Sequence, residues 1–174
     1  MLLLAAVGCV FWRAWACDDA FITFRYVANC LAGYGPVFNV GERVQGFSHP
    51  LWFLLLLVGG FFANVYLVAI VAGLVSTAII VLLLTALGRR ERQPSLRLLA
   101  AVGVLISSPA FVVYQTSGLE NSLTNLLVVL LFGWSYRRID QGDTPAAATA
   151  AFLCSLLILN RPDHVFLCVP IVLG

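Results

Sequence analysis

The run VYLVAIVAGLVSTAIIVLLLTAL occupies residues 65–87 and contains no charged side chain. A helix needs about 20 apolar residues to cross the hydrocarbon core of a bilayer, so this run is long enough for one crossing. It belongs to a longer uncharged segment, because no charged residue lies between Arg43 and Arg89. A membrane helix is therefore the first element that the sequence predicts.

The composition of the whole chain agrees with this prediction. Of its 174 residues, 61% are apolar and only 10% are charged, whereas soluble domains average about 45–50% and 25%. The net charge is only +2, too small for a surface that binds nucleic acid. These values exclude a cytosolic enzyme, a nucleic-acid-binding module and a disordered chain, and they indicate an integral membrane protein in contact with a lipid bilayer.

The distribution of arginines predicts the topology. The segment 43–89 has room for one crossing and an interfacial helix, or for two crossings. One crossing places the arginines at 89, 90, 92, 97, 137 and 138 in the cytoplasm, as the positive-inside rule favours. Further crossings are then expected at 98–113, 122–136, 145–159 and from 165 onward. Residues 51–62 become a helix on the outer interface, with Trp52 as an aromatic anchor.

The two ends of the chain are less regular. Residues 2–15 form a short first span, although a cleaved signal peptide is an alternative because Ala14-Trp15-Ala16 fits a cleavage site. The last residue, Gly174, falls inside an apolar run. The expected fold is all-α, a polytopic transmembrane bundle with a long extracytoplasmic first loop that carries amphipathic interfacial helices. Residues 1–174 would form one membrane domain, the N-terminal part of a longer one.

The first loop, residues 17–50, combines charges, glycines and turn residues. Its apolar residues 20, 24, 27 and 31 recur at helical spacing, and Gly33 can end the helix. This predicts an amphipathic helix of roughly 14 residues. Residues 39–42 read as a tight turn between two short extended pieces, and Pro50 suits the first turn of the interfacial helix. Cys17 and Cys30 are either small apolar fillers or, in an oxidising compartment, a disulfide.

The one-crossing topology gathers acids, cations and both histidines on the outer face, from three loops far apart in sequence. This favours either an active site or a solvated loop surface. The acids and histidines in this set are also candidates for holding a divalent cation, because carboxylate oxygens suit Mg²⁺ or Ca²⁺. The residues concerned are Asp18, Asp19, Glu42, Glu120, Asp163, Arg25, Arg43, Arg161, His49 and His164.

The pair Asp18-Asp19 has two interpretations. The first is an N-cap and a first-turn acid, which satisfy free backbone amides and the helix dipole. The second is catalysis, since two carboxylates at a membrane rim are unusual for capping alone. Asp18 is the first candidate for a base, because a residue before the first turn is freer to point toward a cavity.

The first loop resembles a known family. Residues 18–52, DDAFITFRYVANCLAGYGPVFNVGERVQGFSHPLW, are similar to the first extracytoplasmic loop of GT-C membrane glycosyltransferases, in the branch of cell-wall arabinofuranosyltransferases. The segments TSGLE (116–120) and NRPD (160–163) also match family segments. Gln45 and His49 depart from the pattern, where an acid and a small residue are commoner.

The resemblance implies transfer of a sugar from a polyprenyl-phosphate donor to an envelope glycan or glycolipid outside the cytoplasmic membrane. Such chemistry needs a carboxylate base for the acceptor hydroxyl, here Asp18 or Asp19. It also needs a cation for the leaving phosphate, for which Arg25 and Arg161, with neighbouring His164, are candidates. Contacts with lipid headgroups are the alternative role for these cations.

Two further acids have an open role. Glu120 and Asp163 either bind substrate hydroxyls or begin the helices that follow them. A different class of protein, a transporter or channel segment, would place ionisable groups at the midplane. Here the charges fall at the two faces, which favours an enzyme; a small structural membrane subunit is the third class.

Overall fold

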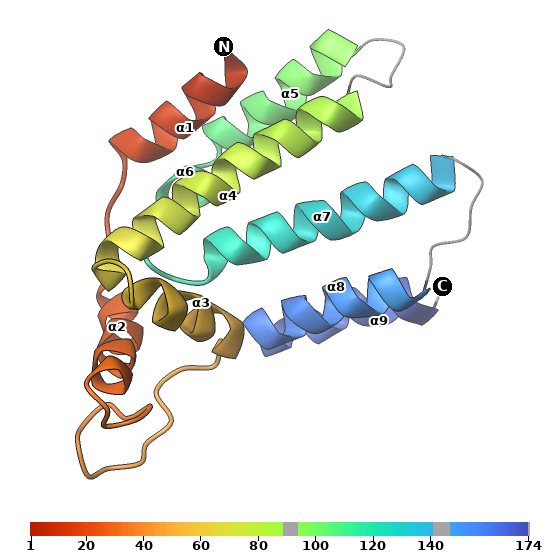
Figure 1. Ribbon diagram of the computed structural model, residues 1–174. Helices are drawn as coiled ribbons and strands as arrows, with labels where there is room; N and C mark the ends of the chain where they lie inside the picture. The colour runs from red at the N-terminus through yellow and green to blue at the C-terminus, as the bar shows by residue number, and fades with distance from the viewer. Residues whose placement is uncertain (89–93, 141–146, 174) are drawn as a thin grey trace.

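The computed structural model describes residues 1–88, 94–140 and 147–173, and every regular element in these ranges is helical (Figure 1). The predicted all-α class is therefore confirmed. Arg89, Arg90 and Arg92, predicted for the cytoplasmic side, lie outside the described residues. The elements are α1 (Leu2–Trp12), α2 (Asp18–Leu31), α3 (Pro50–Gly60), α4 (Val65–Gly88), α5 (Pro94–Ser107), α6 (Pro109–Tyr114), α7 (Asn121–Asp140), α8 (Ala147–Asn160), the 3₁₀ turn η1 (Pro162–His164) and α9 (Val165–Leu173).

Helix α4 is the central element, and it packs against α1, α5 and α7. Among the described residues it is the helix that is long and apolar enough to cross a membrane. The preceding helix α3 is separate and has only 11 residues. One long helix and one short helix are what the one-crossing prediction expects for this segment; the number of crossings and their direction stay predictions.

The ends of the helices lie at two ends of the bundle (Figure 1). Helices α2 and α3 lie at one end, together with the connection between α6 and α7 and with η1. The C-terminal ends of α4 and α7 lie at the other end. We call the first the α2–α3 end, and it holds the charged residues that the sequence singled out.

Helix α2 has the predicted length of 14 residues and the predicted amphipathic character. One side of it, including Ala20, Thr23 and Val27, is buried. Gly33 has φ +86°, in the left-handed region that glycine adopts at low cost, just beyond the end of the helix. The N-cap is Cys17, so Asp18 and Asp19 both lie in the first turn. The prediction that Asp18 precedes the helix is wrong.

The loop that follows α2 folds back along this helix. The predicted turn at 39–42 is present: the Glu42 amide donates to the carbonyl of Asn39 over 3.1 Å. Gly46 lies directly against the Tyr26 ring, where a Cβ would come within 2.7 Å. The predicted helix start at Pro50 is confirmed, with the proline at the first position of α3.

Trp52 is not an interfacial anchor. Its side chain is only 1% exposed, and its indole packs in the core between α2 and α3. Helix α3 is apolar on nearly all sides, so its sequence alone does not reveal which side faces the protein. The predicted role of Trp52 is therefore wrong.

The predicted span at 98–113 is divided into α5 and α6. Pro109 lacks an amide hydrogen and disfavours helical backbone at Ser108. Ser108 instead becomes the N-cap of α6, and its hydroxyl accepts a hydrogen bond from the amide of Phe111. The second half of this segment is therefore free to turn toward the α2–α3 end.

A close backbone approach joins α4 to the segment after α6. A Cβ at Gly73 would collide with the carbonyl oxygen of Gln115, so only glycine fits there. The Gln115 side-chain amide donates to Thr77 Oγ1 (2.9 Å) and accepts from Asn125 Nδ2 (2.8 Å). These contacts satisfy a fully buried glutamine inside an apolar bundle.

All five cysteines are free thiols. Cys17 caps α2 and Cys30 lies in its last turn, so the axial rise of the helix separates them by roughly 20 Å. A disulfide between them is excluded, because bridged Cα atoms lie within about 7 Å of each other.

Candidate functional site

The break between α6 and α7 is the framework of the candidate site. Donors from other elements reach the carbonyl groups of this break and of the last turn of α6. Gly118, with φ +83°, supplies the sharp turn. The donors are Trp15 Nε1 to the Val113 oxygen (2.9 Å), the Cys17 amide to Ser117 (2.7 Å), Trp52 Nε1 to Gly118 (2.9 Å) and Asn160 Nδ2 to Glu120 (3.1 Å).

This break delivers Glu120 to the centre of a charged cluster. One carboxylate oxygen lies 3.3 Å from Nδ1 of His49, and the other lies 3.4 Å from Nη1 of Arg161. The side chain is only 12% exposed. The carboxylate therefore does not cap α7; the backbone carbonyl of Glu120 begins that helix by accepting from the Thr124 amide (2.9 Å).

Arg161 joins Glu120 to the residues of η1. Its Nε and Nη2 donate to the two carboxylate oxygens of Asp163, each over 3.2 Å. The hydrogen bond from Arg161 is the main cause that lowers the pKa of the Asp163 carboxyl. His164 Nδ1 lies 3.4 Å from Asp163. The structure thus brings together all four substrate-binding candidates of the later loops: Glu120, Arg161, Asp163 and His164.

Two further residues complete the cluster: His49, which the sequence placed on the outer face without a specific role, and Thr23, which it did not single out. The Thr23 hydroxyl lies 2.9 Å from Nε2 of His49, so α2 contacts the residue that caps α3. Burial lowers the pKa of His49, Glu120 raises it, and Arg161 lowers it again. The sequence placed His49 on the outer face only through its loop, and Thr23 gave no signal because it is one of several buried positions of an amphipathic helix.

The aspartate pair lies in the first turn of α2, the helix that also carries Thr23. At 3.6 residues per turn, Asp19 is about 40° from Thr23 around the α2 axis, whereas Asp18 is about 140° away. Asp19 is therefore on the Thr23 side of the helix, one turn closer to its start. Both aspartates are exposed, and within the described residues neither carboxylate has a hydrogen-bond or ion-pair partner.

Arg25 is not brought to the cluster. It lies about 160° from Thr23 around the helix axis, and its Nε donates to the carbonyl of Phe38 over 2.7 Å. The guanidinium also covers the Phe38 ring, 4.9 Å from its centroid. These contacts give Arg25 a role in holding the first loop against α2.

The cation-binding interpretation finds no support in the part of the chain that the structure describes. No three side chains among its His, Cys, Asp and Glu residues converge in a way that could hold a metal ion. In the cluster itself the carboxylates of Glu120 and Asp163 are paired with Arg161. The positively charged guanidinium of Arg161 therefore lies between the two carboxylates, where a metal ion would have to bind.

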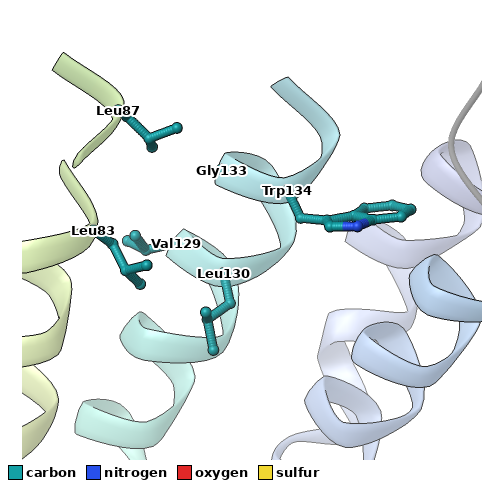
Figure 2. A pocket seen from close by; sticks show the side chains of 6 residues that line it. All are labelled: Leu83, Leu87, Val129, Leu130, Gly133 and Trp134. Carbon is teal, nitrogen blue, oxygen red and sulfur yellow. The ribbon is translucent and has the colours of Figure 1, made fainter. Parts of the chain in front are cut away.

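An apolar groove lies between the C-terminal halves of α4 and α7, toward the other end of the bundle (Figures 1 and 2). Figure 2 shows Leu83 and Leu87 of α4 facing α7, while the ring of Trp134 points toward the neighbouring helices. Its lining offers no carboxylate, imidazole or guanidinium. The groove therefore lacks the groups that acid–base chemistry and phosphate binding require.

Comparison with known proteins adds one finding. The chain is similar to two terminal β-(1→2)-arabinofuranosyltransferases. The protein from Mycobacterium tuberculosis is 36% identical over 166 residues, which cover 87% of this chain and 26% of the relative. The protein from Corynebacterium glutamicum is 36% identical over 145 residues, which cover 78% of this chain and 21% of the relative. No family model and no solved structure matches the sequence.

The extent of the similarity is unequal in the two directions. Most of this chain aligns with each relative, but it spans only about a quarter of their length. The similarity agrees with the resemblance of the first loop to arabinofuranosyltransferases. What the complete relatives do is attributed to this chain only as a proposal.

Proposed function

We propose that these 174 residues are part of the membrane domain of a glycosyltransferase that uses a polyprenyl-phosphate sugar, with arabinofuranose as the sugar. The acceptor is an envelope glycan or glycolipid on the outer face of the cytoplasmic membrane. The observation that carries the proposal is the cluster around Glu120, where candidates from separate loops meet. The break that carries Glu120 also contacts the start of α2, through the hydrogen bond from the Cys17 amide to the Ser117 carbonyl. The names of the two relatives support the reaction class.

In this proposal Asp19 is the general base. The acceptor hydroxyl oxygen attacks the anomeric carbon of the donor while the bond from that carbon to the phosphate oxygen breaks. The hydroxyl proton passes to the Asp19 carboxylate, and the phosphate leaves with the bonding electrons. Asp19 is preferred over Asp18 because it shares the side of α2 on which Thr23 contacts the cluster.

Arg161 is the proposed partner of the leaving phosphate. Its planar guanidinium can bind two phosphate oxygens and stays charged. Asp163 occupies that position in this structure, but its side chain is 61% exposed. An exposed ion pair contributes little stability, so exchange of the Asp163 carboxylate for a phosphate costs little. His164, beside Asp163, lies close enough to add a second donor.

Glu120 is proposed to orient Arg161. Its residue type and loop position alone would also allow it to bind acceptor hydroxyls, but both of its oxygens already face partners within the cluster. A largely buried carboxylate between a histidine and an arginine is suited to hold the guanidinium in one orientation. The acceptor is therefore placed on the exposed side of the cluster, near Asp19.

The experiment is a transfer assay with membranes that contain the full-length protein in a host without this activity. Radiolabelled polyprenyl-phosphate arabinofuranose and an envelope acceptor are supplied, with polyprenyl-phosphate mannose as a parallel donor. Transfer of label from the first donor is expected. Absence of transfer from both, with the protein present in the membrane, would contradict the proposed reaction, and transfer from mannose alone would change the sugar.

A further inference from the structure

Three side chains from separate segments form a continuous polar chain at the α2–α3 end. The Thr23 hydroxyl of α2 lies 2.9 Å from Nε2 of His49, and the opposite ring nitrogen lies 3.3 Å from Glu120. Thr23 is 2% exposed, and the side chains of His49 and Glu120 are 11% and 12% exposed. This Thr23–His49–Glu120 chain ends on Arg161, which contacts the second oxygen of Glu120.

The partners fix where the proton of the imidazole lies. An ionised carboxylate can only accept, so Nδ1, which faces Glu120, carries the proton. In the neutral ring Nε2 is then an acceptor, and the Thr23 hydroxyl donates to it. Each ring nitrogen therefore has one partner of the right kind, and the ring cannot turn over without losing both.

We infer that His49 is a positioning residue: it holds the Glu120 carboxylate in the orientation that keeps Arg161 at the proposed phosphate site. The role in transfer rests on the proposed function, whereas the geometry does not. A buried carboxylate requires partners for its oxygens. Without His49, one oxygen of Glu120 loses its partner, and the carboxylate is free to rotate against Arg161.

The charge of His49 bears on the same role. The charged groups that face it are Glu120 from the break before α7 and Arg161 from the turn after α8, with Asp163 and His164 one contact further. Burial favours the neutral ring and lowers the pKa of His49 below its usual 6.5. A hydroxyl both donates and accepts, so Thr23 remains a partner when His49 becomes protonated. The imidazolium then attracts Glu120 more strongly and competes with Arg161 for it.

The first test measures the proton position and the pKa of His49 and does not require sugar transfer. The full-length protein is labelled with ¹⁵N-histidine in lipid bilayers, and the His49 signals are identified by their loss in His49→Asn. At pH 7 we expect a neutral ring with its proton on Nδ1. In Glu120→Gln the pKa of His49 should fall, because the carboxylate that favours the charged ring is gone. A ring protonated on Nε2, or a His49 pKa indifferent to Glu120→Gln, overturns the inference.

The second test reads the role in transfer. His49→Asn and Thr23→Val should lower kcat by about 10- to 100-fold, as expected when a group is slightly misplaced. Because the pKa of His49 is lowered from its usual value, wild-type kcat should fall only on the acid side of pH 6.5. His49→Asn should lack this loss. Gln45→Ala, an exposed change in the same loop, should keep the wild-type pH profile.

The outcomes separate the inference from the proposed function. If wild-type protein transfers no sugar, the proposed reaction fails, and the proton position and pKa of His49 still decide the geometry. If wild-type protein transfers sugar and both variants, at matched membrane levels, keep its kcat and pH profile, His49 has no positioning role. Thr23→Val provides this result even if His49→Asn does not fold.

Discussion

The indole Nε1 of Trp52 donates a hydrogen bond to the carbonyl oxygen of Gly118, 2.9 Å away and 66 residues along the chain. This contact ties α3 to the break between α6 and α7. Gly118 also lies against Ala20 and Phe24 of α2, where a Cβ would come within 2.7 Å of Ala20. Three elements therefore meet at one glycine, two residues before Glu120.

Loss of this hydrogen bond should destabilise the protein. Trp52→Phe keeps an aromatic ring in the core but leaves the Gly118 carbonyl buried without its donor, which costs about 1–3 kcal/mol. The measurement is reversible unfolding in detergent micelles. Trp15→Phe is the matched control: Trp15 makes the same kind of bond to Val113, but it is 39% exposed, so water can replace the donor. Equal losses in the two variants would contradict the prediction.

Local patterns in the sequence were sufficient to predict several elements. The spacing of apolar residues and Gly33 predicted the length and the end of α2, and the position of Pro50 predicted the start of α3. The uncharged run at 65–87 predicted α4. Each of these features depends on neighbours within about two turns, which is the range over which a sequence pattern acts.

Contacts between distant segments could not be predicted in the same way. His49 and Glu120 are 71 positions apart, and nothing in either loop names the other as its partner. Arg25 was a candidate for the leaving phosphate, but the returning loop places Phe38 beside it. The sequence predicted that the outer loops share one face, and the pairing within that face required the folded chain.

Labelling of introduced cysteines should reveal the orientation of the bundle. In a variant without its five native cysteines, Glu42→Cys and Asp163→Cys should react with an impermeant thiol reagent added to intact cells, because both positions are exposed and predicted to be outside. Arg90→Cys should react only after permeabilisation. Reaction at position 90 in intact cells would contradict the one-crossing topology and with it an outer site.

Substitutions of Arg161 should separate the effect of its charge on donor use from the effect of its planar geometry. Arg161→Lys keeps the charge but cannot bind two phosphate oxygens in parallel. It should lower kcat/KM for the polyprenyl-phosphate donor by an amount that corresponds to about 1.5–3 kcal/mol of activation free energy, the contribution of a hydrogen bond to a charged group. Arg161→Ala should lower kcat/KM further. Arg25→Lys is the control at a cation outside the cluster. Wild-type transfer by Arg161→Ala would reduce Arg161 to a headgroup contact.

The aspartate pair allows a test of catalysis against helix stabilisation. Asp18 and Asp19 share the first turn of α2, so replacement of either by Asn removes the same favourable charge at the helix start, about 0.3–1 kcal/mol. The two variants should therefore be equally stable. The two side chains leave the helix in different directions, because only Asp19 is on the Thr23 side of α2.

The rate of sugar transfer should therefore distinguish the two variants. Asp19→Asn should lose transfer by about 100-fold or more, whereas Asp18→Asn should lose much less. The rates are compared at matched membrane expression: two active variants would contradict catalysis by this pair, and a loss confined to Asp18→Asn would contradict the assignment of the base from the face of α2.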